Sequence, residues 1–202
     1  MAISMENYVI TISRQFGSLG RSIAQKMSEM LSIEFYDRDI VETTAKRMGQ
    51  PVSVISNKEE NVGSIFFKRQ YPLGMGLLHM QNEIFCVQEN IIRDLAAKES
   101  CIIVGRCADS ILKDYKRSLN IYVYAPYEAR LRNCTETLKM DEKTAKKMIR
   151  DVDRAREEYR LRYCPEVRDM FDNRDLMIDS SRFGVDGTAA ILTNIAKEMF
   201  YG

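Results

Sequence analysis

The chain has 202 residues, 45% of them hydrophobic, and its 30 lysines and arginines nearly balance its 29 aspartates and glutamates. This length is enough for one α/β domain with a substantial core, and the hydrophobic fraction is ordinary for a globular protein. A net charge of +1 gives no reason to expect binding to nucleic acid or to a membrane surface.

The sequence also lacks the common signals for export, membrane insertion and metal binding. No run of about 18 apolar residues predicts a transmembrane helix, and residues 1–10 carry neither the basic residues nor the apolar stretch of a signal peptide. The five cysteines show no C-x-x-C spacing, and the chain has one histidine. We therefore expect a cytoplasmic protein with reduced thiols and no cysteine–histidine metal site.

The first predicted strand, Tyr8–Ser13, leads into a glycine-containing loop and a helix. The strand is a short β-branched run, and the helix, Ser22–Leu31, carries apolar residues at helical spacing. A glycine turn, a basic residue, a hydroxyl residue and a helix start are the order that a phosphate-binding loop requires. The candidate phosphate-binding residues are Gly17, Ser18, Leu19, Gly20, Arg21 and Ser22, the last of which is also the candidate Mg2+ ligand.

The match to the consensus phosphate loop G-x-x-x-x-G-K-[ST] is imperfect. Gln15 replaces the first glycine, and Arg21 replaces the lysine. A guanidinium can hold two phosphate oxygens at once, but it is bulkier than an ammonium group. Taken alone, the segment is also compatible with an ordinary strand-to-helix turn that needs two glycines.

The second predicted strand, Ile33–Tyr36, ends at Asp37 and Arg38, which precede a predicted helix, Asp39–Met48. Asp37 could orient a magnesium-bound water or an acceptor hydroxyl, and Arg38 could bind a phosphate. The alternative is that Asp37 merely caps the following helix.

The region after this helix is expected to be less regular. Pro51 is a candidate first residue of a short helix. Residues 61–76 hold three glycines, a proline and several aromatics without a clear period, which predicts a mobile insert. A long helix, Leu77–Lys98, follows.

The third predicted strand, Cys101–Val104, is followed at once by Gly105 and Arg106. In parallel sheets, ligands bind at the carboxyl ends of the strands. Arg106 would therefore face a ligand crevice and could bind an acceptor phosphate, although an ordinary surface arginine is the alternative.

The C-terminal part is predicted to hold two more strands and three helices. The strands are Leu119–Tyr124 and Leu176–Ile178, and the helices are Tyr127–Leu138, Asp141 to about Tyr163, and Thr188–Phe200. The second of these helices carries a run of arginines that includes Arg154 and Arg156. Such a run is usually a solvated face with acidic partners, but it could also form a lid over a transferring phosphoryl group.

Strands that alternate with helices indicate a parallel sheet covered on both faces. The candidate residues at the glycine loop, at Asp37 and at Gly105–Arg106 all lie just after predicted strands. They should therefore meet at one edge of the sheet, where such folds bind ligands.

Five segments together resemble the cytidylate kinase-like family of P-loop proteins, in the family's order and roughly its spacing. They are ISRQFGSLGRS (12–22), FYDRD (35–39), IIVGRCAD (102–109), DVDRAR (151–156) and DLMIDSS (175–181). Each segment is short, but the set spans almost the whole chain.

This resemblance implies a three-layer P-loop NTPase fold in one domain, residues 1–202. The domain would have a five-stranded parallel sheet, a helical acceptor-binding insert at about 38–98 and a lid at about 139–163. It further implies transfer of a phosphoryl group from ATP, with Mg2+, to a nucleoside monophosphate, with CMP or dCMP as the first guess. By position, Gly17–Ser22 would bind the ATP phosphates, Asp37, Arg38, Gly105 and Arg106 the acceptor, and Arg21, Asp37, Arg154 and Arg156 would act in catalysis.

Two other functions stay open from the sequence. A kinase of the same fold could act on another small phosphate or hydroxyl acceptor. A nucleotide-binding regulatory protein without useful catalysis would account for the replacements at Gln15 and Arg21.

Overall fold

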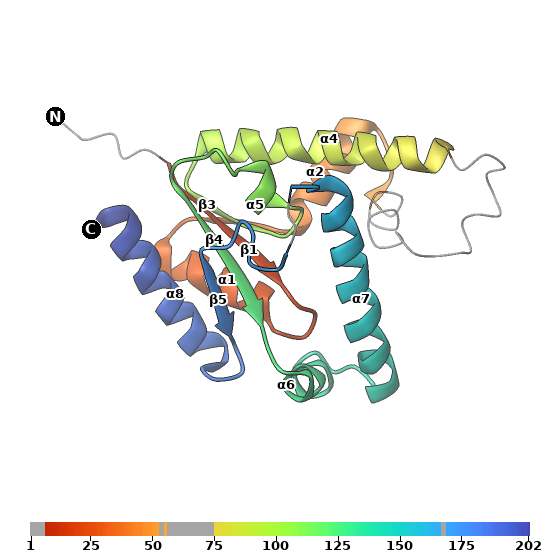
Figure 1. The fold of residues 1–202 in the computed structure, drawn as a ribbon. Helices are drawn as coiled ribbons and strands as arrows, with labels where there is room; N and C mark the ends of the chain where they lie inside the picture. The colour runs from red at the N-terminus through yellow and green to blue at the C-terminus, as the bar shows by residue number, and fades with distance from the viewer. Residues whose placement is uncertain (1–6, 53–54, 56–74, 167–168) are drawn as a thin grey trace.

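The computed structural model describes residues 7–52, 55, 75–166 and 169–202, which build one parallel sheet with helices on both faces (Figure 1). The strands are β1 (Val9–Arg14), β2 (Glu34–Tyr36), β3 (Cys101–Val104), β4 (Ser118–Tyr124) and β5 (Leu176–Asp179). The helices are α1 (Gly20–Leu31), α2 (Arg38–Met48), α4 (Met75–Lys98), α5 (Ala108–Ile111), α6 (Tyr127–Arg132), the π-helix η2 (Asn133–Thr137), α7 (Glu142–Tyr163) and α8 (Gly184–Tyr201).

The five strands lie in the order β2-β3-β1-β4-β5, and every neighbouring pair is parallel. Ile12 of β1 pairs with Val104 on one side and with Ile121 on the other. Because all strands run the same way, the loops that follow β1, β2 and β3 emerge at one edge of the sheet. The predicted five-stranded parallel α/β fold is confirmed.

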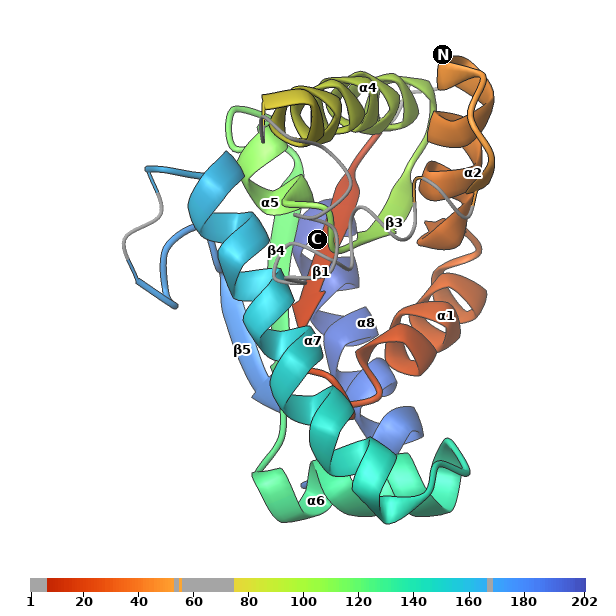
Figure 2. The same ribbon diagram turned by 90° about the vertical axis from the view of Figure 1, so that its right-hand side faces the viewer.

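Helices lie on both faces of the sheet (Figure 2). The core consists of two apolar layers, one on each face. Ile10 and Ile12 of β1 pack with Ile23 and Met27 of α1, and α8 completes that layer. On the opposite face of the sheet, Val9 of β1 and Cys101 and Ile103 of β3 pack against α4 and α5. Burial on both faces explains why these strands read as continuous apolar runs rather than alternating patterns.

Helix α7 passes beside the carboxyl ends of the strands (Figure 1). Its C-terminal half docks on α4, where the ring of Tyr163 stacks on Phe85 at 4.2 Å and the Tyr159 hydroxyl donates to Gln88 Oε1 at 3.1 Å. The aromatic contacts bury apolar surface and so fix α7 across the edge where ligands bind in such folds.

Two predicted helices differ from the structure, and a third helix, α5, was not predicted. The predicted helix Tyr127–Leu138 gives way to π-helix geometry at η2, a local widening that apolar spacing does not reveal. Helix α8 begins at Gly184 rather than Thr188, because glycines at 184 and 187 weaken the pattern of its first turn. The four-residue helix α5 is too short to show a period.

Most of the predicted insert, residues 61–76, and most of the short helix after Pro51 lie outside the described residues. Among the residues that the structure does describe, no helix is both long and apolar enough to cross a membrane.

Candidate active site

The loop after β1 is held in a shape that requires glycine. Gly17 has φ +78, and a Cβ there would approach the Arg130 carbonyl oxygen to 2.9 Å and Cys134 Sγ to 3.0 Å. Leu19 also adopts a left-handed conformation, with φ 59, directly before α1. The loop is therefore a specific, tightly packed turn rather than a loose connection.

Hydrogen bonds tie this loop to the neighbouring elements. The Ser180 hydroxyl donates to the Ser18 carbonyl at 2.8 Å, and the Asn133 side chain donates to the Gly17 carbonyl at 2.8 Å. Gln15, which stands in place of the consensus glycine, accepts from the Ala125 N–H at 3.1 Å. The glutamine thus anchors the loop to the residues after β4, an architectural reason for this replacement.

The start of α1 is suited to an anion. No side chain caps it, and no acidic residue lies in its first turn. First-turn N–H groups and the positive end of the helix dipole favour phosphate at such a position. The exposed Ser22 lies in this turn, where its hydroxyl could meet a metal bound to phosphate oxygens.

Asp37 pairs with arginines instead of capping α2. Its carboxylate makes no cap hydrogen bond. Asp37 Oδ2 lies 3.0 Å from Arg21 Nε, and Oδ1 lies 3.8 Å from Arg14 Nη2. The Asp37 side chain is 9% exposed while that of Arg21 is 55% exposed, so a buried carboxylate positions a solvent-facing guanidinium beside the phosphate loop.

The turn after β3 has an uncommon backbone. Gly105, Arg106 and Cys107 have φ values of 77, 60 and 54, so three successive residues are left-handed and two of them are not glycine. Such geometry costs about 1–3 kcal/mol for each non-glycine residue, here Arg106 and Cys107, and is concentrated at functional sites. It presents Arg106 at the carboxyl edge of the sheet.

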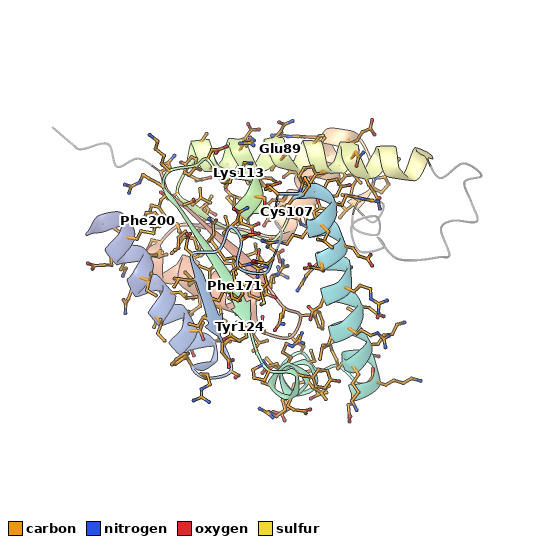
Figure 3. All side chains as sticks on the ribbon, viewed as in Figure 1. Glu89, Cys107, Lys113, Tyr124, Phe171 and Phe200 are labelled. Carbon is orange, nitrogen blue, oxygen red and sulfur yellow. The ribbon has the colours of Figure 1, made fainter. Side chains whose placement is uncertain are left out.

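Buried contacts hold this turn in place. Asp109 pairs with Arg160 of α7 at 3.1 Å, and burial raises the pKa of the Asp109 carboxyl while Arg160 opposes that shift. Cys107 lies near the C-terminal end of α7 (Figure 3), where it packs with Cys164. Its hydrogen bond to Cys164, together with burial, raises the pKa of the Cys107 thiol. Helix α7 thus supports the turn that carries Arg106.

Helix α7 also contacts the phosphate loop directly. Arg156 donates from Nη1 to the Arg14 carbonyl at 3.0 Å. Asp153 accepts from the Phe16 N–H at 2.7 Å and forms an ion pair with Arg130, which in turn donates to the Phe16 carbonyl at 3.3 Å. Burial lowers the pKa of Arg156, an effect that Asp153 and Asp37 oppose.

Arg14 and Arg21 pair with Asp37, and Arg106 and Arg156 lie close enough to act on the charge of Arg14. We call these four the arginine cluster: Arg14, Arg21, Arg106 and Arg156. The pKa of Arg14 is lowered to about 9, mainly by burial and also by Arg156, Arg106 and Arg21, whereas Asp37 opposes the shift. Because that value lies well above neutral, Arg14 is a cation at pH 7. The cluster offers concentrated positive charge next to a helix N-terminus, an arrangement that can bind phosphate groups.

The structure brings together most of the residues singled out from the sequence. The phosphate loop, Asp37, Gly105–Arg106 and Arg156 meet at one edge of the sheet, while Arg154 is exposed on α7. Arg38 begins α2, and its side chain is outside the described part of the chain.

Sequence reasoning missed Arg14 and Asp153. Arg14 is the last residue of a buried strand, just before the glycine loop. A charged residue at the end of an apolar strand, where ligands bind in parallel sheets, is the sequence signal that could have identified Arg14. Asp153 lies 137 residues from its partner Phe16, and no local pattern reveals such a contact.

The described residues hold no group of three or more histidine, cysteine, aspartate or glutamate side chains that could bind a metal. Mg2+ in phosphate-transfer sites takes many of its ligands from substrate and water, so one hydroxyl and one carboxylate, as at Ser22 and Asp37, form a compatible donor set.

Comparison with known proteins agrees with this architecture. The sequence model of the cytidylate kinase-like family matches residues 9–182. No curated protein sequence matches this chain.

Solved structures share the fold at low identity. An uncharacterized protein from Eubacterium ventriosum has a TM-score of 0.71 and 24% identity, with 95% of this chain and 99% of that chain covered. Shikimate kinase from Bacteroides thetaiotaomicron has a TM-score of 0.57 and 10% identity, covering 94% and 98%. A gluconokinase from Sinorhizobium meliloti has a TM-score of 0.53 and 11% identity, covering 98% and 97%.

Proposed function

Because the chain belongs to the cytidylate kinase-like family, we propose that it transfers the γ-phosphoryl group of ATP to a nucleoside monophosphate, with CMP or dCMP as the first acceptors to test. The observation that carries the proposal is the arginine cluster around Asp37, beside the phosphate loop and the N-terminus of α1. Phosphoryl transfer depends mainly on positioning and on positive charge around the transferring group, and this edge of the sheet supplies both.

The reaction needs no protein nucleophile. An acceptor oxygen forms a bond to the γ-phosphorus as the bond to the β–γ bridging oxygen breaks, and ADP leaves with that electron pair. Gly17–Ser22 would hold the ATP phosphates, Arg21 would bridge their oxygens, and Arg154 and Arg156 would offset charge on the transferring group. Asp37, Arg38, Gly105 and Arg106 would hold the acceptor.

The proposal includes Mg2+ as the partner of ATP. Ser22 would hold it through its hydroxyl, with Asp37 in a position to orient its water ligands. When bound, Mg2+ would neutralise charge on the phosphate oxygens. The protein's own contribution is to fix the phosphate chain by the loop N–H groups and by Arg21.

The domain assignment is part of the same proposal. Residues 38–98 would form the acceptor-binding insert and residues 139–163 the lid, which contains α7. The contacts of Asp153 and Arg156 with the phosphate loop support a lid that closes over the bound phosphates. The proposed partners are ATP and a small-molecule nucleotide, and the proposed location is the cytoplasm.

A kinase for a hydroxyl-bearing acceptor is the second candidate. Asp37 supports this second candidate, because its carboxylate does not cap α2 and could accept a proton from an attacking hydroxyl. Solved shikimate kinase and gluconokinase structures have the same fold, which is consistent with this alternative.

The test is ADP release from Mg2+–ATP with the purified protein against CMP, dCMP, UMP, AMP, shikimate and gluconate. We expect selective turnover with one nucleoside monophosphate. Turnover only with a hydroxyl acid would support the second candidate instead. ATP binding without turnover of any acceptor would favour a regulatory nucleotide-binding protein, and Arg21→Lys would then test whether the arginine limits catalysis.

A further inference from the structure

Arg14 belongs to the arginine cluster, but the proposed function gives it no individual role. It ends β1, and its side chain is 19% exposed. Nη2 lies 3.8 Å from the Asp37 carboxylate, while Arg156 bonds the Arg14 carbonyl from above the loop. A guanidinium this deeply placed is costly to bury unless a counter-charge meets it.

Gly105 leaves the space that the Arg14 side chain fills. A Cβ on Gly105 would lie 2.2 Å from Arg14 Nη1, so any other residue would displace the guanidinium. The left-handed φ of +77 at Gly105 adds a second reason for glycine. The turn after β3 therefore leaves the space that the guanidinium of Arg14, at the end of β1, occupies.

The electrostatic surroundings of Arg14 favour an anion. The guanidinium groups of Arg156, Arg106 and Arg21 destabilise the charged form of Arg14, and the Asp37 carboxylate stabilises it. Asp153 of α7 acts on Arg156 in the same cluster, and its two oxygens already bind the Phe16 N–H and Arg130. A phosphate dianion would relieve this repulsion through charge-assisted hydrogen bonds.

The position of Arg14 indicates which phosphate it would meet. Its guanidinium lies among the ends of β1, β2 and β3, next to Asp37 and Gly105. Asp37 and Gly105 belong to the acceptor side of the proposed site. On the ATP side, Gly20 of the phosphate loop faces the stem of Arg14, because a Cβ on Gly20 would lie 2.8 Å from Arg14 Cβ. The guanidinium therefore points from the phosphate loop toward the acceptor side.

We propose that Arg14 is a binding residue for the phosphate group of the acceptor, and that Gly105 keeps open the space its guanidinium needs. This inference rests on the proposed function for the identity of the acceptor. Arg14 fixes the acceptor phosphate beside Arg106 before transfer, so its loss should weaken acceptor binding more than ATP binding.

The first experiment measures phosphate binding and needs no catalysis. Inorganic phosphate is titrated calorimetrically into the wild type, Arg14→Gln, Arg14→Lys and Gly105→Ala, with and without a saturating non-hydrolysable ATP analogue. We expect the Kd for phosphate to rise at least about tenfold in Arg14→Gln and in Gly105→Ala, and less in Arg14→Lys, which keeps a charge.

Arg117→Gln is the matched control. Arg117 is also partly buried and donates to a backbone carbonyl, that of Phe200, but it precedes β4 at the opposite edge of the sheet. Circular dichroism and thermal unfolding identify any variant that fails to fold. If Arg14→Gln unfolds, Arg14→Lys and Gly105→Ala still decide the question.

The second experiment separates KM from kcat with whichever acceptor the wild type phosphorylates. Arg14→Gln should raise the acceptor KM about tenfold or more while the KM for ATP changes less than about twofold. Wild-type phosphate affinity in folded Arg14→Gln, or an equal loss in Arg117→Gln, overturns the inference. Absence of turnover in the wild type rejects the proposed function alone, because the phosphate titration still tests Arg14.

Discussion

Arg154 and Arg156 lie two residues apart on α7, yet the structure gives them different surroundings. Arg156 is partly buried, bonds the Arg14 carbonyl and belongs to the arginine cluster, whereas Arg154 is exposed. The sequence pattern treats the two alike, because both match the same short arginine motif. Burial and contact with the phosphate loop therefore rank Arg156 above Arg154 for a role in catalysis.

We predict that Arg156→Ala lowers kcat about 100-fold, the usual cost of removing one preorganised donor at a transferring group. Arg154→Ala should lower kcat less than about tenfold, since its side chain faces solvent in this structure. Steady-state kinetics with Mg2+–ATP and the preferred acceptor measure both. Lys147→Ala, another exposed α7 residue, controls for changes in the helix itself.

A larger loss for Arg154→Ala than for Arg156→Ala would contradict this ranking. It would mean that α7 turns on closing and brings Arg154 to the transferring group. The folded state of each variant is checked by thermal unfolding, because Arg156 also supports the end of β1.

The docking of α7 on the phosphate loop depends on one carboxylate, that of Asp153. Asp153 bonds the Phe16 N–H and pairs with Arg130, whose side chain is only 11% exposed. Removing Asp153 would leave a mostly buried arginine without this partner and a loop N–H without its acceptor. Helix α7, the phosphate loop and α6 would then lose the contacts through Asp153 that join them.

We predict that Asp153→Ala lowers the free energy of unfolding by about 1–3 kcal/mol and weakens ATP binding, because the loop is no longer held. Asp151→Ala is the matched control, since Asp151 pairs with the exposed Arg150 on the same helix and should cost less than about 0.5 kcal/mol. Urea denaturation and ATP titration measure the two effects. Equal destabilisation by both variants would show that Asp153 acts through the helix alone.

The elements themselves were largely predictable from sequence. The β-branched runs of β1 and β3 are buried on both faces, so composition alone marks them as strands of a covered parallel sheet, whereas β4 fully buries only alternate residues. The π-helix η2 was not predictable, because its widening depends on contacts such as the bond from Asn133 to the Gly17 carbonyl.

The candidate site was predictable where chemistry follows a strand directly. Asp37 and Gly105–Arg106 could be placed at the sheet edge because each comes immediately after an apolar run. Arg14 and Asp153 could not be assigned roles, since their partners lie on other elements and only packing brings them together. Local patterns therefore locate the edge of the site, while tertiary contacts select the side chains that converge on it.

The charged site and the apolar core occupy different parts of the sheet. The arginine cluster gathers at the carboxyl edge, while the core lies between the sheet and its two helical layers. Cys101, at the start of β3, belongs to that core and is fully buried. Its titration should therefore report global unfolding rather than events at the site.

Burial raises the pKa of Cys101 from 9.0 to about 12. Between pH 9 and 12 the unfolded chain releases a proton that the folded chain keeps, so this thiol's contribution to stability is lost as the pH rises, by up to about 1.4 kcal/mol per pH unit. Cys101→Ala lacks that contribution, and we predict that the gap in unfolding free energy between wild type and variant shrinks from pH 9 to pH 11. Urea denaturation under reducing conditions measures the gap, and Cys86→Ala, which removes an exposed thiol, controls for the loss of a cysteine as such. A gap for Cys101→Ala that stays constant over this range would mean that the thiol ionises alike in the folded and unfolded chain, and that water reaches β3 from the side that α4 covers.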